Sequence, residues 1–158
     1  MGVAVLLHEI MVVIWVGGMF FAYMHLRPVA AEQLEPPARQ RLWVGVFARF
    51  FPWVWAAVVL ILATGFYMIF GVYGGFGNVG FYVHAMLLLG LIMMAIFMHV
   101  FFAPYKRLRK AVEAEDWPAG GKQLGQIRVM VGINTLIGLV TIAIAGAGPY
   151  LAAAAQGS

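Results

Sequence analysis

The chain has 158 residues, of which 64% are hydrophobic and 10% are charged, and its mean hydropathy is +0.93. A water-soluble domain carries roughly 25% charged residues, so this composition excludes an ordinary soluble domain and indicates a membrane protein. The sequence contains no cysteine, which excludes disulfides, thiolate zinc sites, iron–sulfur sites and cysteine nucleophiles.

Four apolar stretches, each long enough to cross a bilayer, follow one another along the chain. One span needs about 20 apolar residues, so four spans use roughly 80 to 100 residues and leave no room for a second domain. We therefore predict an all-α integral membrane four-helix bundle that forms one domain over residues 1–158. The predicted spans cover residues 3–23, a segment that starts within 43–55 and runs to 70, residues 81–102 and residues 129–147.

Prolines and glycines mark the predicted ends of these spans. Proline disfavours helix at the preceding residue, so Arg27-Pro28 is expected to close the first span and to start a loop over residues 28–41. Pro104 closes the third predicted span, and Gly148-Pro149 closes the fourth. The uncharged, glycine-rich residues 71–80 predict a tight turn between the second and third spans.

The basic residues are confined to two of the connections. All ten Lys and Arg residues lie in or beside the first and third connections, the third being the polar segment 105–122. By the positive-inside rule these connections are cytoplasmic, which puts both termini outside in a multi-pass protein of a bacterial inner membrane. The basic residues thereby account for the pI of about 9.7 without nucleic acid as a partner.

Histidines are the residues in the spans that can carry chemistry. Only His8, Glu9, His25, His84 and His99 are ionisable within the spans or at their ends, and such residues are costly in a bilayer. The first and third spans run in the same direction, so His8 and His84 form an outer pair, while His25 and His99 form an inner pair. The helix rise separates the two pairs by about 22 to 25 Å, which fits within one bilayer.

Paired imidazoles on neighbouring helices of a bundle suit a metal ion or haem iron. The pairs therefore predict one or two b-type haems, whose carboxylates would need cationic partners on the inner side. The predicted metal ligands are His8, His84, His25 and His99, and the predicted partners of the haem carboxylates are Arg27 and Arg107.

Each histidine also has a plainer interpretation, as a neutral side chain hydrogen-bonded to backbone or water near the membrane surface. His25, beside Arg27 at a helix end, fits that interpretation best. Glu9 could accept a hydrogen bond from a ligand histidine, exchange protons, or simply reach outer water.

The ten methionines favour a different metal. Thioether and imidazole groups suit Cu(I), and Met24 and Met98 each precede an inner histidine. However, sequence neighbours point about 100° apart on a helix, and methionine commonly fills gaps in an apolar core. A copper-handling protein with His and Met ligands is thus the alternative to a haem protein.

Several segments resemble the copper-resistance D (CopD) membrane family over nearly the whole chain. They are Leu7-His8, Trp15-Val16-Gly17-Gly18-Met19-Phe20, Arg27-Pro28, residues 53–70 with Ala63-Thr64-Gly65, Tyr82-Val83-His84-Ala85, and Asn134 with Gly138. This resemblance implies copper handling. The pattern is also similar to HemJ-type protoporphyrinogen oxidases, four-helix proteins thought to bind haem. His8 and His84 of this chain match histidines at the starts of the first and third helices in that family. Met86 stands where that family has a lysine, so oxidase chemistry is in doubt.

The function predicted from these observations is a histidine-ligated haem b membrane protein with a redox or electron-transfer role, such as a membrane oxidoreductase linked to quinone. The alternatives are a CopD-like copper-handling protein and an accessory subunit of a larger membrane complex. The expected partners are membrane lipid and either quinone or a redox partner protein, and a homo-oligomer is compatible with the sequence.

Overall fold

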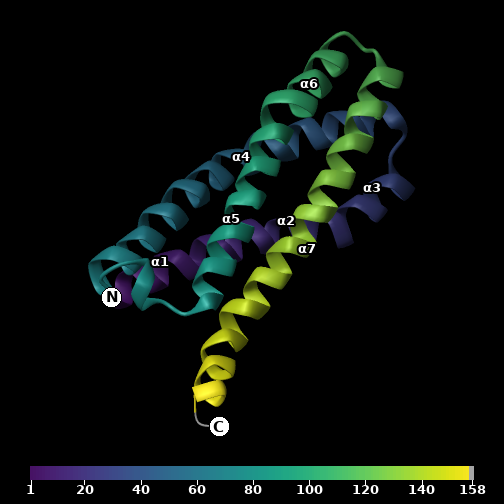
Figure 1. The fold of residues 1–158 in the computed structure, drawn as a ribbon. Helices are drawn as coiled ribbons and strands as arrows, with labels where there is room; N and C mark the ends of the chain where they lie inside the picture. The colour runs from purple at the N-terminus through teal and green to yellow at the C-terminus, as the bar shows by residue number, and fades with distance from the viewer. Residues whose placement is uncertain (157–158) are drawn as a thin grey trace.

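The computed structural model describes residues 1–156, which form four long helical rods and contain no strand. The rods cover Gly2–Gln33, Pro36–Val72, Phe81–Glu113 and Trp117–Ala154, and each is long and apolar enough to cross a membrane. The prediction of an all-α membrane four-helix bundle is therefore confirmed. Both termini lie at the end of the molecule opposite to α3 and α6 (Figure 1).

The first rod is one continuous helix in which α-helical segments alternate with two wider π-helical turns. Its segments are α1 (Gly2–Val12), a π-turn (Val13–Gly17), α2 (Gly18–Phe21), a second π-turn (Ala22–Leu26) and α3 (Arg27–Gln33). The second rod consists of α4 (Pro36–Phe66) and a π-turn (Tyr67–Val72).

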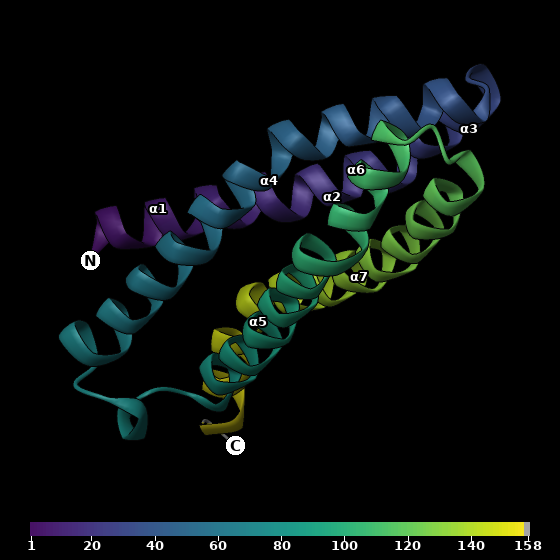
Figure 2. The same cartoon turned by 90° about the horizontal axis from the view of Figure 1, so that it is seen from above.

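The other two rods follow a short 3₁₀ turn (Phe76–Asn78). The third rod consists of α5 (Phe81–Val100), a π-turn (Phe101–Tyr105) and α6 (Lys106–Glu113), and the fourth is α7 (Trp117–Gln156). In the bundle α1 packs beside α4 and α5 packs beside α7 (Figure 2).

The predictions that Pro28, Pro104 and Pro149 end helices are wrong, because the helix continues through all three. A proline lacks an N–H group, and its ring crowds the carbonyl four residues earlier. The π-turn before Pro28 and the π-turn that contains Pro104 widen the helix at these places. Membrane helices tolerate the missing hydrogen bond through such local adjustments.

The connections are consequently shorter than predicted. The loop expected over residues 28–41 reduces to Leu34 and Glu35, since Pro36 begins α4 in the first helical turn, where proline needs no hydrogen-bond partner. The glycine-rich turn follows Val72, and Gly74 and Gly75 have φ angles of 76° and 122° that favour glycine.

The connection before α7 is fastened by side chains. The Ala119 N–H donates to Asp116 Oδ1 at 3.0 Å, so Asp116 caps the start of α7. Across the bundle, Gln40 Nε2 donates to the Trp117 carbonyl at 2.8 Å and Arg41 pairs with Glu115 at 3.1 Å. These contacts hold the start of α4 against the start of α7.

Aromatic side chains form much of the core between the second and third rods. The ring of Phe51 meets those of Phe97, Phe101 and Tyr105 edge to face, with centroids 5.5, 5.8 and 4.8 Å apart. Such edge-to-face pairs add to the stabilisation that burial provides.

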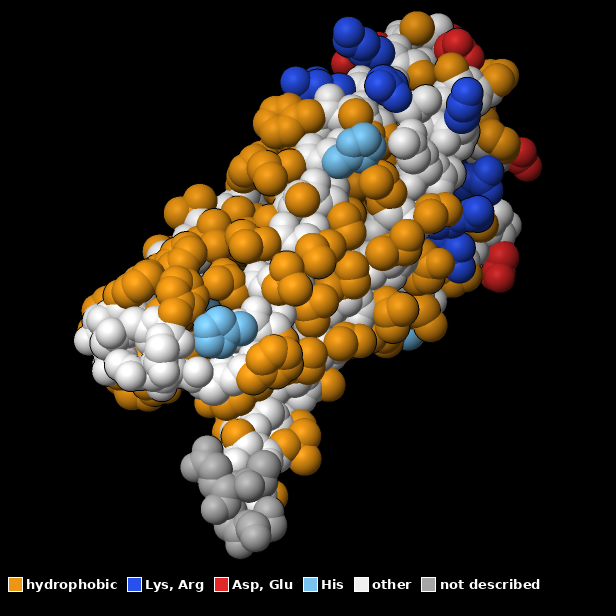
Figure 3. All heavy atoms as spheres, viewed as in Figure 1, with side chains coloured by type: hydrophobic (Ala, Val, Ile, Leu, Met, Phe, Trp, Pro, Cys, Tyr) orange, Lys and Arg blue, Asp and Glu red, His pale blue; other side chains and the backbone are white. Residues whose placement is uncertain are grey.

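The surface divides into an apolar middle and a charged end. Apolar side chains cover most of the visible length of the molecule, while blue Lys and Arg side chains gather at the end that holds α6 (Figure 3). Large hydrophobic side chains such as Val59, Phe81 and Leu136 are exposed, which suits contact with membrane lipid.

Candidate metal centre

A cavity of about 380 Å³ lies between the four rods, toward the end of the bundle that carries the termini. Side chains from α1, α4, α5, α7 and two π-turns line it, and no Lys, Arg, Asp or Glu is among them. Its size is that of a ligand pocket. The side chains with imidazole nitrogen or thioether sulfur that line it are His8, Met68, Met86, Met93 and Met94.

His8 is held in one orientation by a hydrogen bond across to α4. Its Nδ1 lies 2.9 Å from Thr64 Oγ1, and Thr64 donates its single hydroxyl proton to the Leu60 carbonyl at 2.6 Å. Because that proton is used, the His8 Nδ1–H must donate to Thr64. A neutral imidazole protonated at Nδ1 carries its lone pair at Nε2, which is the arrangement typical of histidine metal ligands.

The imidazole of His8 lies beside Gly65 of α4. A Cβ at residue 65 would lie 3.6 Å from His8 Cε1, which is an ordinary van der Waals contact. The half-buried imidazole is thus held by the hydrogen bond at its Nδ1 and lies against α4.

The methionines follow one face of α5. Met86, Gly90, Met93 and Met94 stand at positions i, i+4, i+7 and i+8, and all four line the cavity. Gly90 leaves space between them, since a Cβ there would meet nothing within 4 Å. Met93 and Met94 are 3% and 5% exposed, and Met68 approaches from the π-turn that ends the second rod.

The other three histidines predicted as metal ligands lie outside the His8 cavity. His84 is exposed, its Nδ1 lies 3.3 Å from the Gly80 carbonyl oxygen, and its ring packs against Phe76. His25 is exposed against Phe20 and Phe21, and His99 is exposed as well. None of these three lines the cavities of about 520, 380 and 330 Å³ in the described part of the chain.

Glu9 and the two arginines predicted to pair with haem carboxylates also lie away from the His8 cavity. Glu9 is exposed and does not line the His8 cavity, Arg107 is exposed, and Arg27 lines a different cavity near the basic end. In the part of the chain that the structure describes, no three His, Asp or Glu side chains come together as a metal site.

Asn134 lies in the buried middle of the bundle. Its Nδ2 donates to the Met93 carbonyl at 3.4 Å and to Met19 Sδ at 3.6 Å, whereas Oδ1 has no partner among residues 1–156. It lines a smaller, almost entirely apolar cavity of about 330 Å³. Asn134 thus joins α7 to the backbone of α5 at Met93, within the methionine stripe that Met86, Met93 and Met94 form on α5.

Comparison with known proteins identifies the family. A family model described as copper resistance protein D matches residues 44–147, more than half of the chain. The chain belongs to the CopD family. The CopD match includes Thr64 and the four cavity methionines, while His8 precedes it. Neither the comparison with curated proteins nor that with solved structures found a match, and the resemblance to HemJ-type oxidases is not shown.

Membership of the CopD family favours copper over haem. The haem prediction needs His8 and His84 to face each other, but only His8 lines the cavity. Matched depth in the membrane does not set the direction of a side chain, because each residue also turns the helix by about 100°. The haem prediction thus has no support in the geometry of this CopD protein.

The sequence alone did not single out Thr64 and Met68 as candidate site residues. Thr64 stands in the Ala63-Thr64-Gly65 segment quoted for the family resemblance, but its role depends on an imidazole 56 positions away. The stripe of Met86, Met93 and Met94 could have been found from its helical spacing.

Proposed function

We propose that this protein handles copper by binding Cu(I) as its cargo in the cavity lined by His8 and the four methionines. The observation that carries the proposal is the His8–Thr64 hydrogen bond, which reserves Nε2 of His8 for a ligand beside the methionine side chains. Membership of the CopD family supports it independently.

The donor chemistry favours a soft ion. Thioether and imidazole groups suit Cu(I), whereas hard cations such as Mg²⁺ and Ca²⁺ prefer carboxylate and carbonyl oxygens. The lining of the cavity offers no carboxylate, and its polar groups are few. A monovalent ion also needs less compensating charge in an apolar cavity than a divalent ion does.

We further propose that the protein lies in a bacterial inner membrane with its basic end in the cytoplasm. Under the positive-inside rule the His8 cavity then lies toward the outer surface. Copper would in that case enter from the outside. Quinone and redox-protein partners stay predictions from the sequence alone.

The test is Cu(I) affinity of the purified protein in detergent, measured under anaerobic, reducing conditions by competition with a chromophoric chelator. His8→Gln should lower the affinity at least tenfold, because the imidazole ligand is lost. His99→Gln is the matched control, since His99 is exposed and does not line the His8 cavity, and it should leave the affinity unchanged.

Two results would overturn the proposal. One is equal Cu(I) affinity in the unmodified protein and the His8→Gln variant. The other is a Soret band with stoichiometric iron in the purified protein, which would favour the haem prediction instead. X-ray absorption at the copper edge should show sulfur neighbours together with nitrogen, and an oxygen-only environment would count against the methionine ligands.

A further inference from the structure

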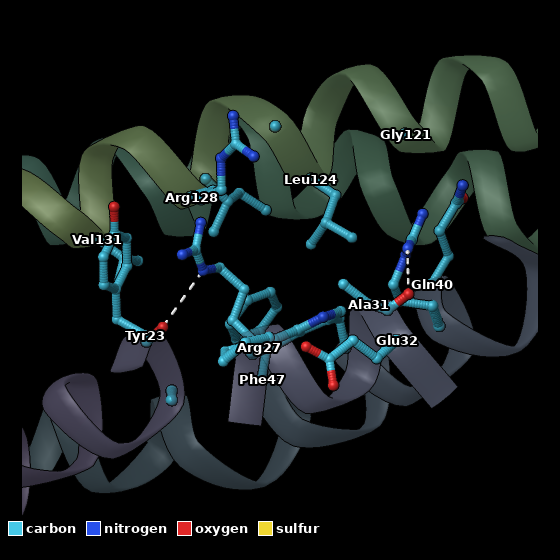
Figure 4. Close-up of a pocket in the computed structure, with 16 residues that line it drawn as sticks. Tyr23, Arg27, Ala31, Glu32, Gln40, Phe47, Gly121, Leu124, Arg128 and Val131 are labelled. Atoms are coloured by element: carbon cyan, nitrogen blue, oxygen red, sulfur yellow. Dashed lines mark hydrogen bonds between the residues drawn. The ribbon is translucent and has the colours of Figure 1, made fainter. Parts of the chain in front are cut away.

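A second and larger cavity, of about 520 Å³, opens at the basic end of the bundle. It lies between the end of the first rod, the start of α4 and the first part of α7, as Figure 4 shows. Three arginines line it, one from each of these elements: Arg27, Arg39 and Arg128. The proposed copper function uses none of them.

The arginines of this cavity lack a neutralising partner. The ion pairs among residues 1–156 are Arg41–Glu115 and Arg109–Glu113, neither of which involves them. Glu32 is the one carboxylate that lines the cavity, and it lies outside ion-pair distance of every Lys, Arg and His in this part of the chain. The cavity thus carries an excess of positive charge.

Each guanidinium also keeps unused hydrogen-bond donors. Arg27 Nε donates to the Tyr23 carbonyl at 3.3 Å, and Arg39 Nη1 donates to the Ala31 carbonyl at 3.5 Å. Arg128 makes no hydrogen bond to another described residue. A guanidinium has five N–H donors, so several remain for a ligand.

Arg27 lines the cavity from the first rod and Arg128 from α7, while Glu32 lies farther along the cavity (Figure 4). The Arg27 guanidinium is held over the Tyr23 ring, 4.6 Å from its centroid. Several like charges that line one cavity favour the binding of an anion there. Guanidinium forks match the oxygens of a phosphate in geometry.

The rest of the lining indicates what carries the phosphate. Aromatic and aliphatic side chains form the walls beside the arginines, and they are Tyr23, Trp43, Phe47, Leu124, Ile127 and Val131. A hydrated inorganic anion gains nothing from such walls, whereas the glycerol and acyl part of a lipid does. Cationic pockets between membrane helices are typical sites for anionic lipid headgroups.

We propose that this cavity binds the phosphate headgroup of an anionic phospholipid between Arg27 and Arg128, with the lipid's apolar part against the aromatic wall. Arg39, on α4, adds positive charge at the same site. The bound lipid would join the first rod, α4 and α7 at the basic end.

Native mass spectrometry of the detergent-purified protein tests this proposal, with phosphatidylglycerol and phosphatidylcholine as probes. Phosphatidylglycerol should bind roughly tenfold more tightly than the zwitterionic lipid, and Arg128→Gln should remove most of that preference. Arg107→Gln is the matched control, because Arg107 is an exposed cation at the same end that does not line the cavity. Arg128→Lys should recover only part of the preference, since it keeps the charge but loses the planar fork.

Two outcomes overturn the proposal: equal binding of the two lipids, or an equal loss in Arg107→Gln and Arg128→Gln, which would mean general attraction to the basic end. A measurement with inorganic phosphate distinguishes a lipid headgroup from free phosphate as the bound anion. If phosphate alone raises the unfolding temperature as much as phosphatidylglycerol does, and Arg128→Gln abolishes both effects, the phosphate site is supported and the lipid is overturned. Unfolding temperatures without ligand verify that each variant is folded.

Discussion

At the scale of single residues, one hydroxyl group decides what His8 can do. Thr64 gives its proton to the Leu60 carbonyl and therefore accepts the proton of His8 Nδ1. The hydrogen bond selects the tautomer whose lone pair lies at Nε2, and it restrains rotation of the ring. Support of this kind around a ligand histidine is typically worth 10-fold to 100-fold in metal affinity.

Thr64→Val should therefore lower Cu(I) affinity by roughly tenfold while preserving the shape of the side chain. Chelator competition measures the change. Thr141→Val is the control, because Thr141 lines the same cavity but bonds only the Ile137 carbonyl of its own helix, at 2.8 Å. Equal affinity in the two variants would show that the Thr64 hydroxyl does not support the ligand.

Met86→Leu and Met94→Leu remove a thioether while nearly conserving volume. Each should weaken Cu(I) binding several-fold and change the free energy of unfolding by less than about 1.5 kcal/mol. Met11→Leu is the control, because Met11 is a buried methionine that does not line the cavity. Loss of affinity in Met11→Leu alone would contradict the assignment of the methionine stripe.

At the scale of helices, the distance between α7 and the first rod depends on small residues. A Cβ at residue 138 would lie 2.9 Å from Val16 Cγ2 and 3.1 Å from Met93 Cε. Val16 has few rotamers available and cannot turn away easily. Gly138 therefore allows α7 to pack against both the first rod and α5 where they border the His8 cavity.

Gly138→Ala should consequently destabilise the bundle by about 1 to 3 kcal/mol, the usual cost of an overpacked contact. Gly146→Ala is the matched control on the same helix, where a Cβ meets nothing within 4 Å, and it should be neutral or slightly stabilising. Reversible unfolding in mixed detergent micelles compares the two. Equal stability of both variants would mean that α7 shifts without cost.

At the scale of the whole molecule, charge separates the two ends of the bundle. Every Lys and Arg lies in the half of the bundle that holds α3, α6 and the start of α7, whereas the His8 cavity toward the other end has no charged lining. The two proposed sites, one for a soft cation and one for an anion, therefore lie at opposite ends of the same four helices.

This separation predicts a single orientation in the membrane, which cysteine labelling can test because the chain has no native cysteine. Gly77→Cys should react with an impermeant reagent from outside, and Ala114→Cys should react only from the cytoplasm. Both positions are exposed and have ordinary φ angles, unlike the neighbouring Gly75 and Glu115. Labelling of both variants from one side would contradict the four-span topology.

The sequence by itself determined the four spans, the basic end and the family resemblance. These follow from local hydropathy, from the positions of Lys and Arg, and from short segments of residues, none of which requires knowledge of how helices pack. The spacing of Met86, Met93 and Met94 also placed them on one face of any helix that contains them.

The tertiary structure alone decided which ionisable residues meet. His8 and His84 are alike in depth, yet His8 turns toward Thr64 and the methionines while His84 is exposed. Arg27 and Arg128 are far apart in the sequence, and only the packing of the first rod beside α7 makes them line one cavity. The physical reason is rotation: each residue turns a helix by about 100° and each π-turn shifts that phase, so neighbours across the bundle depend on how all four helices pack.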